Sequence, residues 1–143
     1  MNTVEQLTQV FNDNFVAYFR SHSAHLNVVG RNFRSDHKLL EGVYTRRQDQ
    51  IDRIGELIRS LGEFAPRSIM EILNDSEIED SEVDGNSEDL LGTIRDNLEQ
   101  LKGCYEELMA VAGSEGHEEI ANYAQDQVLD LAKSIWMLSA TLD

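Results

Sequence analysis

Two histidines and three carboxylates carry the clearest chemical signal in the sequence. They are His25, His37, Glu41, Asp52 and Glu56. The last four follow the pattern H-x3-E-x10-D-x3-E. On one helix, at about 100° per residue, they fall within a stripe about 100° wide. Imidazole nitrogens combined with carboxylate oxygens suit iron or a similar divalent ion. The spacing therefore predicts a metal site that uses all five side chains as ligands.

The distance between the two ends of this stripe requires a second subunit. The fifteen residues from His37 to Asp52 cover about 22 Å, because a helix rises about 1.5 Å per residue. Two antiparallel copies, related by a twofold axis near residues 46 and 47, would set the first half of one stripe beside the second half of the other. His25 precedes a short turn and is placed to fold back toward His37. The sequence thus predicts a homodimer with two equivalent intersubunit sites.

The remaining histidines, His22 and His117, have no comparable set of carboxylates around them, so we expect surface or hydrogen-bonded residues.

Asp52 and Glu56, the carboxylates in the second half of the stripe, have an alternative role. Either could form a surface ion pair with Arg53 or Arg59, worth at most about 1 kcal/mol. Four aromatic residues are expected in the core or at an interface. They are Tyr44, Tyr105, Tyr123 and Trp136.

Four long runs of apolar residues at helical spacing predict the helices that must position these side chains. The predicted helices cover residues 3–29, 36–61, 87–112 and 120–142. Ser87 is the expected N-cap of the third helix, and Pro66 suits the first turn of a short helix over 66–73. A long crossover joins the second and third long helices. This order predicts an all-α, ferritin-like four-helix bundle with a short extra helix in the crossover.

Length and composition predict one mostly helical domain over residues 1–143. The chain is 41% hydrophobic and 27% charged, and no run approaches the roughly 18 apolar residues of a membrane span. Its first residues lack the basic start and apolar block of a signal peptide, so we expect a cytoplasmic protein without membrane association. The single cysteine, Cys104, forms no disulfide framework and fits a core position.

The net charge of −15 argues against direct attraction to nucleic acid, because binding to phosphates depends on clustered lysine and arginine. An acidic surface attracts metal cations instead. The stretch DSEVDGNSEDLL, which begins at Asp80, resembles a calcium loop. Its twelfth position is Leu91 rather than a bidentate glutamate, so we interpret it as a solvated acidic crossover.

The chain resembles the Dps family, the ferritin-like DNA-binding proteins from starved cells. The resemblance lies in AHLNVVGRNFRSDHKLLEGVY, DQIDRIGELIRSLG and IWMLSATL and extends over nearly the whole chain. It implies a hollow dodecamer that oxidises ferrous iron, typically with hydrogen peroxide, with dioxygen as the other candidate oxidant. By position, the ferroxidase ligands of the family fall on the five residues above, the last two being supplied by the twofold mate.

Three features depart from the family pattern. The third ligand is usually aspartate and is Glu41 here, which is one methylene longer. The aromatic that usually follows the first histidine is Leu26, which offers bulk but no redox-active ring. The basic terminal tail of DNA-binding members has no counterpart in this sequence, so direct DNA binding is not expected.

The resemblance also implies a threefold entry pore lined by carboxylates. The candidates are Glu115, Glu118, Glu119, Asp126 and Asp130.

The leading hypothesis is therefore a Dps-like mini-ferritin, a ferroxidase that stores ferric iron and protects against oxidative damage. An alternative keeps the shell but has the site only sequester a divalent metal such as zinc. A third hypothesis, a purely structural helical bundle, leaves the ligand stripe unexplained.

Overall fold

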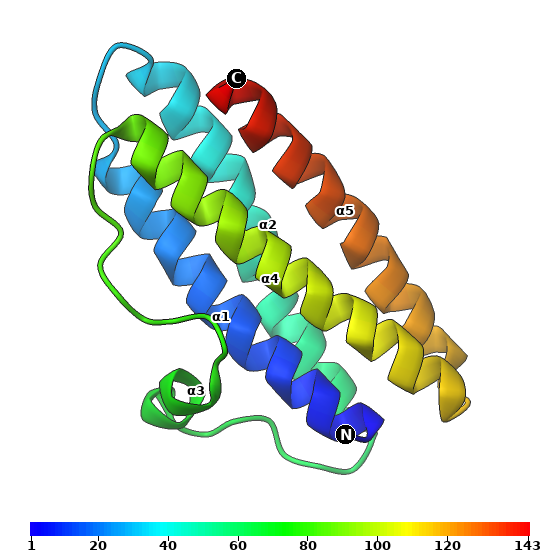
Figure 1. The fold of residues 1–143 in the computed structure, drawn as a ribbon. Coiled ribbons are helices and arrows are strands. Elements are labelled where there is room, and N and C mark those ends of the chain that lie inside the picture. Colours follow the sequence, from blue (N-terminus) through cyan, green and yellow to red (C-terminus); the bar gives the residue numbers. More distant parts are fainter.

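The computed structural model describes residues 1–143 and contains five α-helices and no strands (Figure 1). They are α1 (Thr3–Asn27), α2 (Phe33–Ser60), α3 (Ile69–Asp75), α4 (Ser87–Ser114) and α5 (Glu118–Leu142). The four long helices form a bundle and α3 is the short helix of the crossover. The all-α, ferritin-like bundle expected from the sequence is confirmed. None of the five helices is long and apolar enough to cross a membrane.

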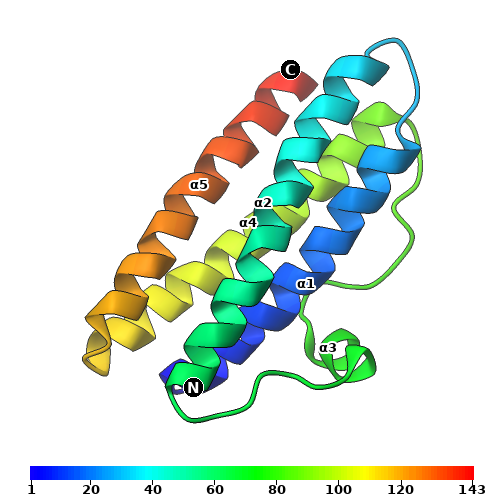
Figure 2. The same ribbon diagram turned by 180° about the vertical axis from the view of Figure 1, so that it is seen from behind.

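Two helical hairpins make up the bundle, and a crossover connects them. The helices α1 and α2 pack together, as do α4 and α5, and α1 also packs on α4. The chain from residue 61 to 86 passes through α3 and returns along the length of the bundle, so α2 and α4 run in the same direction (Figures 1 and 2). Gly30 and Gly62 lie just after the first two helices and have φ angles of +122° and +91°. Glycine adopts this region without the strain that other residues suffer.

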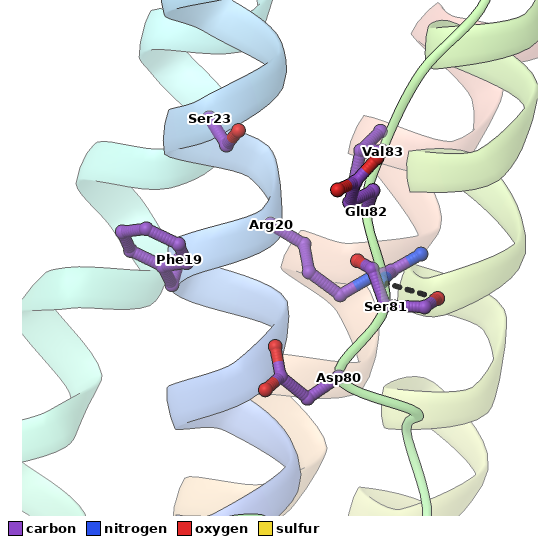
Figure 3. A pocket seen from close by; sticks show the side chains of 7 residues that line it. All are labelled: Phe19, Arg20, Ser23, Asp80, Ser81, Glu82 and Val83. Atoms are coloured by element: carbon purple, nitrogen blue, oxygen red, sulfur yellow. Dashed lines mark hydrogen bonds between the residues drawn. The ribbon is translucent and has the colours of Figure 1, made fainter.

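Twenty-eight buried hydrophobic residues form a single core cluster. Buried polar side chains of α1 hold the crossover against this core. The Asp13 carboxylate accepts hydrogen bonds from the Glu77 N–H, at 2.8 Å, and from the Ser76 hydroxyl, at 3.2 Å. Arg20, only 6% exposed, donates to the Asn97 side chain at 2.8 Å and to the Ser81 carbonyl. Figure 3 shows the Arg20 side chain reaching from α1 to the crossover.

Several helix boundaries differ from the prediction. The helix α2 begins at Phe33 rather than at residue 36. Asn86, not Ser87, is the N-cap of α4, because Asn86 and Asp89 each accept a hydrogen bond from the backbone N–H of the other. This reciprocal capping box satisfies two free N–H groups that a single cap would leave unpaired. The short helix covers Ile69–Asp75 instead of 66–73, so Pro66 precedes it.

The predicted core residues are mostly confirmed. Cys104 is 7% exposed, and its free thiol has a raised pKa because burial and the neighbouring Asp13 disfavour the thiolate. Tyr105 and Tyr123 are buried, with hydroxyl groups 3.3 Å apart. Trp136 is 65% exposed and does not belong to the core of the subunit.

Candidate metal site

The structure brings His25 and His37 together. His25 lies near the end of α1, where it is 6% exposed, and His37 lies near the start of α2. The short turn between the helices folds the second histidine onto the first. The two imidazole rings stack with centroids 3.8 Å apart and planes inclined by 18°. The prediction that His25 folds back toward His37 is therefore confirmed.

Hydrogen bonds fix which nitrogen of each ring is available to a metal. The His25 Nδ1 lies 2.8 Å from the His37 carbonyl oxygen, and the His37 Nδ1 lies 2.8 Å from the His25 carbonyl oxygen. A carbonyl oxygen can only accept, so each Nδ1 must carry the proton and donate. Each Nε2 of the neutral rings then presents a lone pair. Metal-binding histidines commonly have their second ring nitrogen held in this way.

Glu41 lies one helical turn beyond His37 on α2. Its carboxylate is 3.3 Å from the Lys38 ammonium, in a pair whose side chains are 45% and 82% exposed. Such an exposed pair contributes about 1 kcal/mol or less, because water screens it and two long side chains lose freedom. Glu41 can therefore exchange this partner for a metal at little cost.

Asp52 and Glu56 lie farther along α2, exposed and one turn apart. Neither forms an ion pair in the subunit. The Arg53 guanidinium lies over the Tyr123 ring at 5.2 Å, and that of Arg59 lies over Phe64 at 4.2 Å. The alternative of surface ion pairs with these arginines is therefore wrong within the subunit. No group of three or more metal-ligating side chains assembles within the single chain.

An aromatic column beside the histidine pair was not predicted. We use this name for Tyr18, His22 and Tyr44. The Tyr44 ring lies 4.9 Å from that of His25 and stacks on His22, with centroids 3.9 Å apart and planes 2° from parallel. The Tyr18 hydroxyl lies 2.9 Å from the His22 Nδ1. The expectation that His22 is hydrogen-bonded is confirmed. The four-residue spacing of Tyr18 and His22 on α1 was a signal that could have revealed the contact.

The carboxylates expected around a pore have different surroundings. Glu118, Glu119 and Asp126 are exposed. Glu115 accepts hydrogen bonds from the N–H of Thr3, at 2.7 Å, and from its hydroxyl, and these bonds lower the Glu115 pKa. Asp130 pairs with the nearly buried Arg47 at 2.9 Å and with Arg46 at 3.6 Å. Glu115 and Asp130 are thus already engaged inside the subunit, and Glu119 lies 3.9 Å from the His117 Nδ1, in a pair that is ionic only when His117 is protonated.

The architecture defines the class of protein. Two helical hairpins joined by a long crossover, with metal-ligating residue types projecting from α1 and α2, describe a ferritin-like protein. The model of the ferritin-like domain family matches residues 4–143.

Known relatives narrow the class. The chain is 32% identical to the DNA protection during starvation protein of Helicobacter pylori, over 99% of each chain. It is also 32% identical to antigen TpF1 of Treponema pallidum, over 96% of this chain and 78% of that protein. The crystal structure of CAIP from Helicobacter cinaedi superposes with a TM-score of 0.92 at 32% identity, covering 99% of this chain and all of the other. The protein belongs to the Dps family.

Proposed function

We propose that the protein is a mini-ferritin that oxidises ferrous iron at two equivalent sites in each twofold dimer and stores the ferric product in a hollow dodecamer. The observation that carries this proposal is the reciprocal hydrogen bonding of His25 and His37. It leaves two Nε2 lone pairs side by side before any metal arrives. Nitrogen ligands held in advance lower the cost of ordering the site on binding.

The remaining ligands complete the site across the dimer. Glu41 of one chain would bind beside the histidine pair, and Asp52 and Glu56 would come from the other chain. The three carboxylates offset the charge of ferrous and ferric ions, which the neutral imidazoles do not. The proposal is supported by the free, exposed carboxylates of Asp52 and Glu56, because an antiparallel copy of α2 would bring them to the pair about 22 Å away.

Hydrogen peroxide is the proposed oxidant, with dioxygen as the alternative. Two ferrous ions give one electron each to peroxide, its O–O bond breaks, and two protons from solvent complete two water molecules. The acidic chain, with a net charge of −15, favours the approach of ferrous ions. The same charge opposes the phosphates of DNA, so direct DNA binding is not part of the proposal.

Anaerobic loading of the metal-free protein with ferrous iron, followed by peroxide, tests the activity. We expect a rise in ferric absorbance above that of the buffer, and a sedimentation coefficient that fits a dodecamer. His37→Ala should reduce the initial rate on the order of tenfold or more. His117→Ala is the matched control, because His117 lies at the start of α5, outside the site. Stoichiometric zinc binding without iron oxidation would favour the metal-sequestering shell, and the absence of any bound metal would favour a structural bundle.

A further inference from the structure

The aromatic column connects the histidine pair to a hydrogen-bonded phenol. Tyr44 is its middle member, since the Tyr44 ring contacts both His25, at 4.9 Å between centroids, and His22, at 3.9 Å. Tyr18 forms the far end, with its ring 6.4 Å from that of Tyr44. All three members are half-buried, and they come from two helices that pack on each other. Adjacent rings at these separations leave only short steps for an electron.

The contact between Tyr18 and His22 suits the loss of an electron from the phenol. The hydroxyl lies 2.9 Å from the Nδ1. The hydroxyl is the donor in the tautomer of His22 that carries its proton on Nε2, and the electron-donor role requires this tautomer. A phenol gives up an electron far more readily when a base receives its proton at the same time. Tyr44 has no such base, because its hydroxyl forms no hydrogen bond within the subunit, whereas the Tyr18 hydroxyl lies within hydrogen-bonding distance of the His22 ring nitrogen.

We propose that Tyr18, hydrogen-bonded to His22, is an electron donor to the proposed iron site and acts through the ring of Tyr44. This inference rests on the proposed function and adds a reaction to it. A single ferrous ion supplies one of the two electrons that peroxide requires. Tyr18 supplies the other when no second ferrous ion is bound. The column thereby provides the oxidisable ring that Leu26 does not.

The reaction balances without a further reagent. One ferrous ion and the Tyr18 phenol each give one electron to hydrogen peroxide, whose O–O bond breaks. Two protons from solvent complete two water molecules, the phenolic proton passes to the His22 Nδ1, and a neutral tyrosyl radical remains. A later ferrous ion reduces the radical to the phenol, which takes its proton back from His22. Without the tyrosine, one ferrous ion would convert peroxide to hydroxide and a free hydroxyl radical.

The reaction can be detected when iron is limiting. The assembled protein receives one ferrous ion per site under anaerobic conditions, then peroxide, and is frozen for electron paramagnetic resonance. We expect a tyrosyl signal that narrows in protein grown on ring-deuterated tyrosine, which distinguishes it from a radical on Trp136. A spin trap in a parallel sample reports free hydroxyl radical.

Three variants assign the signal. Tyr18→Phe keeps the ring and should abolish the signal while raising the trapped hydroxyl radical several-fold. His22→Phe keeps a ring against Tyr44 but removes the proton acceptor, and should also abolish the signal. Tyr105→Phe, which removes a buried phenol hydrogen-bonded to Tyr123, should leave it unchanged. With two ferrous ions per site, Tyr105→Phe should form ferric iron at close to the rate of the unsubstituted protein.

The outcomes separate this inference from the function on which it rests. Ferric iron without a tyrosyl signal, or a signal that persists in Tyr18→Phe or His22→Phe, would overturn the electron-donor role alone. If the unsubstituted protein forms no ferric iron even with two ferrous ions per site, the proposed function fails, and the role of Tyr18 fails with it.

Discussion

The Nδ1 atoms of His25 and His37 each lie 2.8 Å from the backbone carbonyl oxygen of the other residue. The pair thus closes a ring of contacts between the end of α1 and the start of α2. Both bonds fix the tautomer of an imidazole. The bond to the His25 carbonyl also satisfies one of the free acceptors in the last turn of α1. The nitrogen ligands are consequently part of the fold itself.

A site shared between subunits predicts complementation. His37→Ala and Asp52→Ala chains should each assemble into protein that oxidises iron poorly. When the two are unfolded together in equal amounts and refolded, half of the dimers are mixed, and one of the two sites in each mixed dimer is intact, so about a quarter of the sites regain activity. The measurement is the initial rate of ferric formation after refolding. Recovery in a mixture of His37→Ala and Glu41→Ala would contradict the arrangement, because both lesions lie in the same half of the site.

Removal of metal should leave the fold intact. The histidine pair is held by backbone carbonyls and by stacked rings, not by a bound ion, so this protein should differ from small domains that unfold without zinc. Far-ultraviolet circular dichroism after treatment with a chelator should show the same helical content as before. Saturating metal should raise the midpoint of thermal unfolding through mass action alone. A loss of helix in the chelated protein would show that the pair requires metal.

The buried guanidinium of Arg47 predicts that substitutions around it lower the free energy of unfolding by different amounts. Arg47 is 2% exposed, its Nη2 lies 2.9 Å from Asp130, and its Nη1 has no hydrogen-bond partner. Asp130→Ala leaves this cation without its carboxylate and should lower the free energy of unfolding by about 2 to 3 kcal/mol, less than for a fully buried pair because Asp130 is one-third exposed.

Arg46→Ala is the matched comparison, since Arg46 is 45% exposed and 3.6 Å from the same carboxylate. It should cost less than about 1 kcal/mol. Arg47→Met, which removes the charge and keeps the bulk, should cost less than Asp130→Ala. Denaturant unfolding of the assembled proteins measures all three, and equal effects of Asp130→Ala and Arg46→Ala would argue against an uncompensated buried charge.

Glu115 predicts a contribution to stability that depends on pH. Hydrogen bonds from Thr3 hold the pKa of this carboxyl below its usual value of 4.5. The folded state therefore binds the proton less readily than the unfolded chain. The stabilisation is fully present above pH 4.5 and is lost as the pH falls through the lowered pKa of the folded state.

Glu115→Gln should accordingly lower the thermal midpoint at neutral pH by more than it does in acid. Glu118→Gln is the control, because the exposed Glu118 forms no hydrogen bond or ion pair in the subunit. Differential scanning calorimetry from pH 7 downward measures the two differences. A gap for Glu115→Gln that stays constant across this range would refute the role of the Thr3 contacts.

Most of the fold could be predicted because apolar periodicity alone identifies long helices. The errors lie at the helix boundaries, whose positions depend on local side-chain contacts. Asn86 replaces Ser87 as a cap because it finds a reciprocal partner in Asp89, and apolar periodicity does not register such polar pairs. The helix α2 begins at Phe33, before its apolar run, and the Phe33 ring stacks on His37 with centroids 4.9 Å apart. Both are contacts between residues about one helical turn apart. The spacing of apolar residues over a whole helix does not reveal them.

The candidate site also has a part that could be predicted from the sequence and a part that could not. The proximity of His25 and His37 could be predicted from the sequence, because a short turn joins their helices. The column of Tyr18, His22 and Tyr44 was missed because each member alone is typical of a helix surface, and only the packing of α1 on α2 stacks them. Asp52 and Glu56 remain a prediction as ligands, since their proposed partners belong to another chain.

Hydrogen bonds to two residues of α1 hold the crossover, and a capping box closes it. Asp13 holds residues 76 and 77, Arg20 holds Ser81, and the capping box begins at Asn86. Between the last two points lie residues 82 to 85, of which Val83 packs against the core, whereas Asp84 and Gly85 are exposed, and Gly85 has a φ of +109°. Lengthening a loop costs little entropy when its ends are already fixed. The bond between the exposed Asp84 and Gly85 is consequently the place where a foreign peptide could be inserted and displayed, with the bundle and its histidine pair undisturbed.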